Sequence, residues 1–241
     1  MDGTLLNEHY SFESTKPAVN QLLAAGVSIV LCSSKTRAEI EFYRKKIGIK
    51  DPFISENGAA IFVPQNYFQK SHNYTLSTEE YSIIEIGMPY SKLRQKLHDI
   101  KAKTRSDLIG FGDLTVAEVA RDSGLPFELA VLAKQREYDE PFRMLAGDEG
   151  QLAAAAEAEG VCVAKGDRYW HLKGNHDKGT AVKLLTGLYA ENFGQIRTVA
   201  VGNGSNDLPM LSAVEKPFLV GATERLDELW DKVVAWVSDP K

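Results

Sequence analysis

The sequence has little cysteine, no strong excess of either charge and no long apolar run. Its two cysteines in 241 residues, Cys32 and Cys162, both lie in apolar stretches, which predicts buried, reduced thiols rather than a disulfide framework. A formal net charge of -5 gives no electrostatic reason to expect nucleic acid or an anionic membrane as partner. No apolar run is long enough to span a bilayer and no basic, apolar secretory signature is found, so we expect a cytoplasmic protein.

What the chain does contain is an alternation of helix and strand signals near both ends. Residues 14–25 and 36–47 carry apolar positions at helical spacing, and each stretch is followed by glycine. Short apolar runs at 27–32, 52–55 and 198–201 predict buried strands, and Asn57-Gly58 predicts a hairpin from 52–55 to 59–63. A helix at 177–192, a short helix at 206–214 and a strand at 217–220 complete the pattern.

The middle of the chain has a different pattern of predicted helices and strands. Strands are expected at 82–86, 142–145 and 161–163, and helices at 90–102, 115–122, 126–134 and 149–159. This pattern indicates a compact α+β unit with its own antiparallel sheet. The predicted fold class is therefore α/β, with a doubly wound, Rossmann-like core (1–71 and 166–241) and an inserted α+β cap (72–165). Ligands are expected beyond the carboxyl ends of the core strands, between core and cap.

Four short polar segments near these strand ends carry candidate chemistry. Asp2-Gly3-Thr4 supplies a carboxylate, although a simple turn is an equal interpretation. Ser33 follows the strand 27–32, where a hydroxyl can bind a phosphoryl oxygen or cap the next helix. Lys178 opens a helix and can neutralise an anion, although a lone lysine is more often solvated. Residues 202–207, Gly-Asn-Gly-Ser-Asn-Asp, suit Mg²⁺, or are simply a turn before a capped helix.

In this order the four segments resemble the motifs of the haloacid dehalogenase superfamily. Asp2-Gly3-Thr4-Leu5 is similar to the end of the motif Asp-x-Asp-Gly-Thr-Leu, whose first Asp forms an aspartyl-phosphate. The resemblance implies that Asp2 protonates the leaving alcohol, that Ser33 and Lys178 hold the phosphoryl group, and that Asp2, Asn203 and Asp207 bind Mg²⁺. It places the nucleophilic Asp immediately before Met1, and we expect a central apolar strand to lead into it.

Other segments resemble the mannosyl-3-phosphoglycerate phosphatase family over nearly the whole chain: 33–39, 53–62, 136–142 and 166–171. This implies hydrolysis of mannosyl-3-phosphoglycerate to the compatible solute mannosylglycerate, with Mg²⁺ as cofactor. The resemblance and the charges together give the substrate-binding candidates Ser34, Lys35, Glu56, Asn57, Gly58, Arg136, Arg168, His171 and Asn206. The arginines and Lys35 suit the phosphate and carboxylate of such a substrate, although a weak surface ion pair is an equal interpretation for Arg136.

One departure from the family pattern keeps alternatives open. Asn203 stands where the family usually has Asp, which removes a negative charge and predicts weaker metal binding. The substrate can instead be glucosyl-3-phosphoglycerate or another small sugar phosphate. A catalytically inactive sugar-phosphate-binding protein is the alternative of a different class. The sequence carries no signal for oligomeric state.

Overall fold

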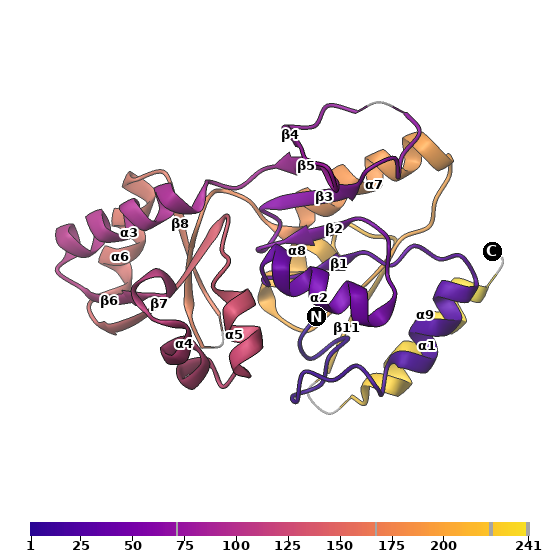
Figure 1. Ribbon diagram of the computed structural model, residues 1–241, viewed down its shortest axis with the longest axis horizontal. Helices are drawn as coiled ribbons and strands as arrows, with labels where there is room; N and C mark the ends of the chain where they lie inside the picture. Colours follow the sequence, from indigo (N-terminus) through magenta and orange to yellow (C-terminus); the bar gives the residue numbers. More distant parts are fainter. Residues whose placement is uncertain (71, 167, 222–223, 240–241) are drawn as a thin grey trace.

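The computed structural model describes residues 1–70, 72–166, 168–221 and 224–239, which fold into two lobes joined by two chain crossings (Figure 1). The core lobe is formed by both ends of the chain and the cap lobe by its middle. The predicted fold class, an α/β core with an inserted α+β cap, is confirmed. No described helix is long and apolar enough to cross a membrane.

The core lobe contains two groups of strands covered by helices. In chain order its elements are α1 (Lys16–Ala24), β1 (Leu31–Cys32), α2 (Arg37–Ile47), β2 (Phe53–Ser55), β3 (Ala60–Pro64), β4 (Leu76–Ser77), β5 (Tyr81–Glu85), α7 (Lys178–Phe193), β10 (Val199–Gly202), η2 (Ser205–Asp207), α8 (Leu208–Leu211), β11 (Lys216–Leu219) and α9 (Leu226–Ser238). One sheet has the order β1-β2-β3-β5-β4, and β10 pairs in parallel with β11.

The cap lobe is an antiparallel sheet with helices beside it (Figure 1). Its elements are α3 (Tyr90–Thr104), β6 (Asp107–Gly110), η1 (Phe111–Asp113), α4 (Val116–Ser123), α5 (Phe127–Ala133), β7 (Asp139–Ala146), α6 (Glu149–Ala158), β8 (Cys162–Lys165) and β9 (Trp170–Lys173). The strand order is β6-β7-β9-β8. Leu93, Leu97, Phe142 and Leu172 are buried between this sheet and helices α3 and α6.

The division between the lobes differs from the predicted boundaries. The strand expected in the cap at 82–86 forms as β5, but it pairs with β3 of the core sheet. Strand β9, which the predicted boundaries place in the core, pairs with β7 and β8 of the cap. Sheet membership therefore changes after residues 85 and 173 rather than at 71 and 165. The spacing of apolar residues indicates that a segment forms a strand, but it does not indicate which strand will pair with it.

Strand β1 is shorter than the predicted strand at 27–32. Only Leu31 and Cys32 pair with β2, and within the described residues no strand pairs with the other edge of β1 or with the free edge of β10. A cavity of about 580 Å³ lies between these two edges. It is lined mainly by apolar side chains of the segments 27–32 and 198–201 and of helices α7 and α9.

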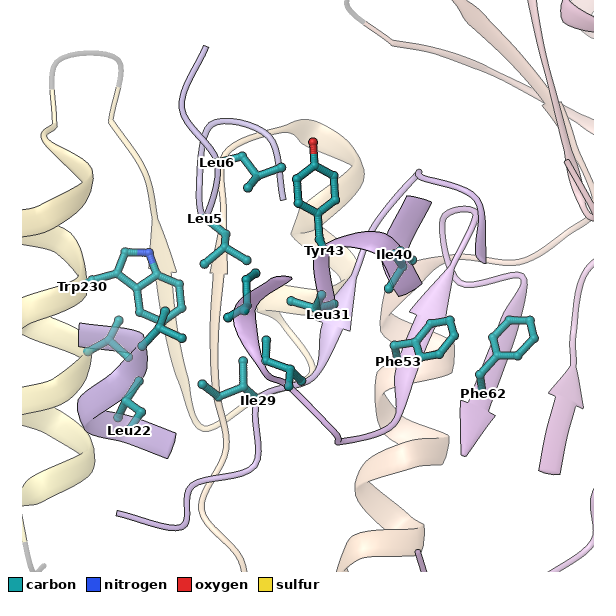
Figure 2. Packing of buried hydrophobic residues seen from close by; sticks show 14 of the residues in the cluster. Leu5, Leu6, Leu22, Ile29, Leu31, Ile40, Tyr43, Phe53, Phe62 and Trp230 are labelled. Carbon is teal, nitrogen blue, oxygen red and sulfur yellow. The ribbon is translucent and has the colours of Figure 1, made fainter. Parts of the chain in front are cut away.

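Buried apolar side chains surround the first turn of the chain and the neighbouring sheet. Leu5 and Leu6 are buried near Trp230 of α9, whose indole N–H donates to the Thr4 carbonyl at 2.9 Å (Figure 2). The rings of Phe53 and Phe62 are stacked with their centroids 4.8 Å apart (Figure 2). This packing fixes the first six residues against the core. Cys32 and Cys162 are free, as predicted, and both residues are partly buried. Burial raises the pKa of the Cys32 thiol to about 11.

Candidate active site

The carboxylate of Asp2 lies in a tight turn at the start of the chain. The backbone N–H groups of Leu5 and Leu6 both donate to the Met1 carbonyl at 2.9 Å, and Gly3 has a φ of 64°. A Cβ at Gly3 would lie 2.3 Å from Nδ2 of Asn203, so glycine suits both this turn and its close approach to the 203–207 loop. Two of the predicted metal ligands are thus brought together from opposite ends of the sequence.

Lys35 connects this turn to the segment that follows β1. Its Nζ lies 3.0 Å from Asp2 Oδ2 and 3.5 Å from Glu39 Oε1, and the side chain is buried. Burial by itself lowers the pKa of Lys35, but the carboxylates of Glu39 and Asp2 outweigh it and raise the pKa above its usual range. The ammonium is therefore a permanent positive charge at the site.

Ser33 occupies the position directly after β1. Its N–H donates to the Ile54 carbonyl at 3.1 Å, and its hydroxyl accepts the Lys35 N–H at 3.2 Å. The residue that caps α2 is Thr36, in a capping box with Glu39, so the interpretation of Ser33 as the helix cap is wrong. The Ser33 hydroxyl lies instead at the carboxyl end of a strand, close to the buried charges.

Lys178 and Asp207 form a buried ion pair between α7 and the loop after β10. Lys178 Nζ lies 2.5 Å from Asp207 Oδ1, and their side chains are only 4% and 8% exposed. Asp207 Oδ2 accepts the N–H groups of Asn203 at 3.0 Å and Gly204 at 3.1 Å. Burial raises the pKa of Asp207, but Lys178 and these N–H groups outweigh it and lower the pKa. The interpretation of Lys178 as a solvated lysine is therefore wrong.

The Met1 amino group lies among the same charges. Burial, followed by the charge of Lys178, lowers the pKa of this amino group to about 6, while Asp2 and Asp207 act in the opposite direction. Two lysines and two carboxylates, from the turn after Met1, the segment after β1, the start of α7 and the loop after β10, thus converge around one point. Such a centre can hold an anion between its two ammonium groups.

The turn between β2 and β3 joins this centre to the cap. Glu56, Asn57 and Gly58 have consecutive φ values of 44°, 62° and 94°. The Glu56 carboxylate is fully buried and accepts the N–H groups of Glu137 at 2.9 Å and Tyr138 at 3.0 Å. Burial raises the pKa of Glu56 to about 8, although Arg136 and the two N–H groups act to lower it. Glu56 therefore anchors the cap.

Asn57 continues this connection through side chains. Its Nδ2 donates to Asp139 Oδ2 at 3.2 Å, and its Oδ1 accepts from Asn206 Nδ2 at 3.1 Å. His171 Nδ1 lies 2.8 Å from the same Asp139 oxygen. Asp139 was not among the site residues predicted from the sequence, although it lies in the segment 136–142 that resembles the family. Nothing in the sequence indicates that its carboxylate is buried.

The two arginines differ in their surroundings. Arg136 is buried, donates from Nη1 to the Ser34 carbonyl at 2.9 Å and lies 3.8 Å from Glu56 Oε2, so its interpretation as a surface ion pair is wrong. Its Nε is buried with no hydrogen-bond partner among the described residues. Arg168 is exposed in the cap and donates to the Ser123 carbonyl at the end of α4. Its neighbour Asp167 lies outside the described residues.

Comparison with known proteins adds to this geometry. The chain matches the family model described as haloacid dehalogenase-like hydrolase over residues 1–108 and 132–239. It is 44% identical over 224 residues to a glucosyl-3-phosphoglycerate/mannosyl-3-phosphoglycerate phosphatase of Methanococcoides burtonii, across 91% of this chain and 82% of the relative. It is 39% identical over 225 residues to a mannosyl-3-phosphoglycerate phosphatase of Pyrococcus horikoshii, across 92% and 88% of the two chains.

Solved structures share the fold at lower identity. A Thermoplasma acidophilum protein superposes with a TM-score of 0.63 at 16% identity, covering 97% of this chain and 93% of the other. A haloacid dehalogenase-like hydrolase from B. subtilis superposes with a TM-score of 0.61 at 17% identity, covering 96% and 90%. These likenesses show a shared fold.

Proposed function

Because the chain belongs to the haloacid dehalogenase-like hydrolases, we propose that it hydrolyses mannosyl-3-phosphoglycerate to mannosylglycerate and inorganic phosphate. Its relatives make it a phosphoric monoester hydrolase, and the identity of the sugar is the part that we propose. The observation that carries the proposal is the convergence of Lys35 and Lys178 with Asp2 and Asp207. Two buried ammonium groups can hold the oxygens of a phosphoryl group, and Asp2 remains half-exposed to a ligand.

The nucleophile in this proposal is an aspartate joined to the Met1 nitrogen. That nitrogen is buried and lies near the charges of Lys178, Asp2, Asp207 and Lys35, so the residue attached to it would lie next to the same charges. The strand leading to it would occupy the cavity between β1 and β10, whose apolar walls suit a strand that is buried on both faces. In-line attack by this carboxylate would form an aspartyl-phosphate and release the alkoxide of the glycerate C3 oxygen, which carried the phosphate.

Asp2 is the group that would protonate the leaving oxygen. Its Oδ2 is held by Lys35 at 3.0 Å, and its Oδ1 is not engaged by any described residue. The same carboxylate, deprotonated by this transfer, would then accept a proton from the water that attacks the aspartyl-phosphate. Lys178 would meanwhile neutralise the phosphoryl oxygens.

The residues present fit Mg²⁺. Asp2, Asn203 and Asp207 offer carboxylate and amide oxygens from two loops in contact, and Mg²⁺ usually binds one or two carboxylates with waters and substrate oxygens. When bound, the ion would shield the negative charges that meet during transfer. Asp207 already accepts from Lys178, Asn203 and Gly204, and Asn203 is neutral, so we expect modest affinity.

Recognition of the sugar belongs to the cap in this proposal. The buried guanidinium of Arg136, with its free Nε, and the His171 side chain suit the substrate's carboxylate and hydroxyls. Arg168 is the weakest of the candidates, because it is exposed and bonded within the cap. The name of the Methanococcoides burtonii relative includes both sugars, so glucosyl-3-phosphoglycerate is the second candidate substrate. The free cysteines favour a reducing compartment such as the cytoplasm.

The test is phosphate release from both sugar phosphates, with Mg²⁺ and with EDTA. The assay compares the chain with two versions that carry the same apolar upstream strand, one ending in Asp before Met1 and a matched control ending in Asn. We expect turnover only from the Asp version and only with Mg²⁺. If the Asp version folds and binds the sugar phosphate but releases no phosphate, the inactive sugar-phosphate-binding alternative replaces the enzyme.

A further inference from the structure

A line of side-chain hydrogen bonds runs from the cap to the loop after β10. It starts at His171 on β9, passes through Asp139 on β7 and Asn57 in the β2–β3 turn, and ends at Asn206. The three links are 2.8, 3.2 and 3.1 Å long. Asp139 is fully buried, and its only described side-chain partners are His171 and Asn57.

The charge of Asp139 determines the direction of every bond in the line. Burial acts to raise the pKa of Asp139, but His171 and Arg136 outweigh it and lower the pKa, so the group is a carboxylate that can only accept. Asn57 must therefore turn its amide nitrogen toward Asp139. Its amide oxygen is left facing Asn206, and Asn206 must in turn present its own nitrogen.

The consequence is found at the candidate active site. With Nδ2 of Asn206 turned toward Asn57, its Oδ1 faces the inside of the loop, where a Cβ on Gly204 would lie 2.7 Å from this oxygen and 3.8 Å from Asp207 Oδ2. The amide oxygen of Asn206, an exposed residue, thus faces the same side of the loop as Asp207 Oδ2. An acceptor at that place suits a hydrated divalent cation or a donor group of the substrate.

We propose that Asp139 is a positioning residue of the cap that, through Asn57, fixes the amide of Asn206 with its oxygen toward the site. The link makes the ligand affinity of the core loop depend on a carboxylate that the cap supplies. The inferred directions of the hydrogen bonds do not depend on the proposed function, whereas the inferred effect on ligand binding does.

Exchanging the carboxylate of residue 139 with the amide of residue 57 tests the directions of these hydrogen bonds. Asp139→Asn replaces the only group that must accept, so Asn57 and Asn206 can rotate by half a turn. In the double variant Asp139→Asn/Asn57→Asp the carboxylate moves one link toward the core. Residue 57 then accepts from both neighbours, and Asn206 is again forced to present its nitrogen. Asn57→Asp alone is the matched control, because it places two carboxylates in contact.

The first readout needs no catalysis. The side-chain NH₂ signals of Asn206, assigned by loss in Asn206→Asp, are followed by ¹⁵N NMR in the whole chain. We expect faster hydrogen exchange in Asp139→Asn than in the wild type, and recovery in the double variant. Melting temperatures are recorded for each protein. If Asp139→Asn does not fold, Asn57→Gly, which suits the φ of 62° at that position, breaks the same line and must give the same fast exchange.

The second readout is the affinity for Mg²⁺ with inorganic phosphate, measured by calorimetry. We expect a loss of about tenfold in Asp139→Asn and recovery to within about threefold in the double variant, as for groups that orient metal ligands. Asn206 signals that are unchanged in Asp139→Asn, or a double variant no better than either single one, would overturn the proposal. If the wild type binds neither probe while the NMR result holds, the proposed function fails and the bond directions stand.

Discussion

Replacing Glu56 by glutamine tests how a buried carboxyl group stabilises the junction of the two lobes. Glu56 is fully buried, and its two oxygens accept the N–H groups of Glu137 and Tyr138. Glutamine keeps the shape but can accept with only one terminal atom, which leaves one N–H facing an NH₂ group. The loss of that bond is expected to cost about 1–3 kcal/mol at a pH where Glu56 is protonated.

The pH dependence of this difference is the sharper expectation. Burial raises the pKa of Glu56 from 4.5 to about 8, so the folded state holds a proton that the unfolded state releases. The resulting stabilisation is fully present below pH 4.5 and is lost as the pH rises through about 8. At about 1.4 kcal/mol per pKa unit, the rise is worth roughly 5 kcal/mol in total. The stability of the wild type relative to Glu56→Gln is therefore expected to fall between about pH 5 and about pH 8.

Urea unfolding followed by tryptophan fluorescence at several pH values in this range measures the difference. Other titrating groups are common to both proteins and cancel in it. Glu85→Gln is the control, because it removes an exposed carboxylate that accepts the Tyr138 hydroxyl in the same region, and its charge stays in water. A difference between wild type and Glu56→Gln that is constant across this range would refute the reasoning.

Three further predictions concern the ion pair, the turn and the cavity. Lys178→Met leaves the buried charge of Asp207 without its partner and is expected to lower the free energy of unfolding in urea by about 3–5 kcal/mol. The control Lys183→Met, at an exposed position of the same helix, is expected to lower it by less than about 0.5 kcal/mol. Equal losses would show that the pair does not matter. Gly58→Ala places a Cβ 2.2 Å from the Asp177 carbonyl at a φ of 94° and is expected to lower the melting temperature far more than Gly26→Ala, which has a φ of 73° but nothing within 4 Å. Similar melting temperatures would contradict the close approach. Adding an apolar strand before Met1 is expected to raise the melting temperature, because it would fill the cavity between β1 and β10. The same strand with its apolar residues changed to serine is not expected to raise it. Equal melting temperatures for the two versions would contradict the placement of the strand in the cavity.

The local signals of the sequence determined most of the individual elements. Helix α2 begins after Thr36 and ends at Gly48, because Thr36 and Glu39 form a capping box and Gly48 adopts the left-handed conformation with a φ of 87°. The hairpin at Asn57-Gly58 and strand β10 were predictable for the same reason: the turn residues and apolar runs that produce them are adjacent in the chain. The prediction that the strand at 198–201 is buried is wrong, because residues 198–201 are only partly buried. Strand β9 and helix α9 escaped prediction. Strand β9 is only four residues long, which is too short for a clear alternating pattern. Helix α9 does carry buried apolar residues at helical spacing, at Leu229, Trp230, Val233 and Val234, so its sequence contains a signal.

Only the tertiary structure decided which segments are neighbours. It placed β5 in the core sheet and β9 in the cap, and it limited β1 to the two residues that have a pairing partner in β2. It also buried Lys178 against Asp207 and connected Asp139 to Asn206 through Asn57. By itself the sequence determined residue types, turns and periods, which depend on neighbours along the chain. Pairing, burial and the direction of hydrogen bonds depend on groups that are distant in sequence, and only packing brings these groups together.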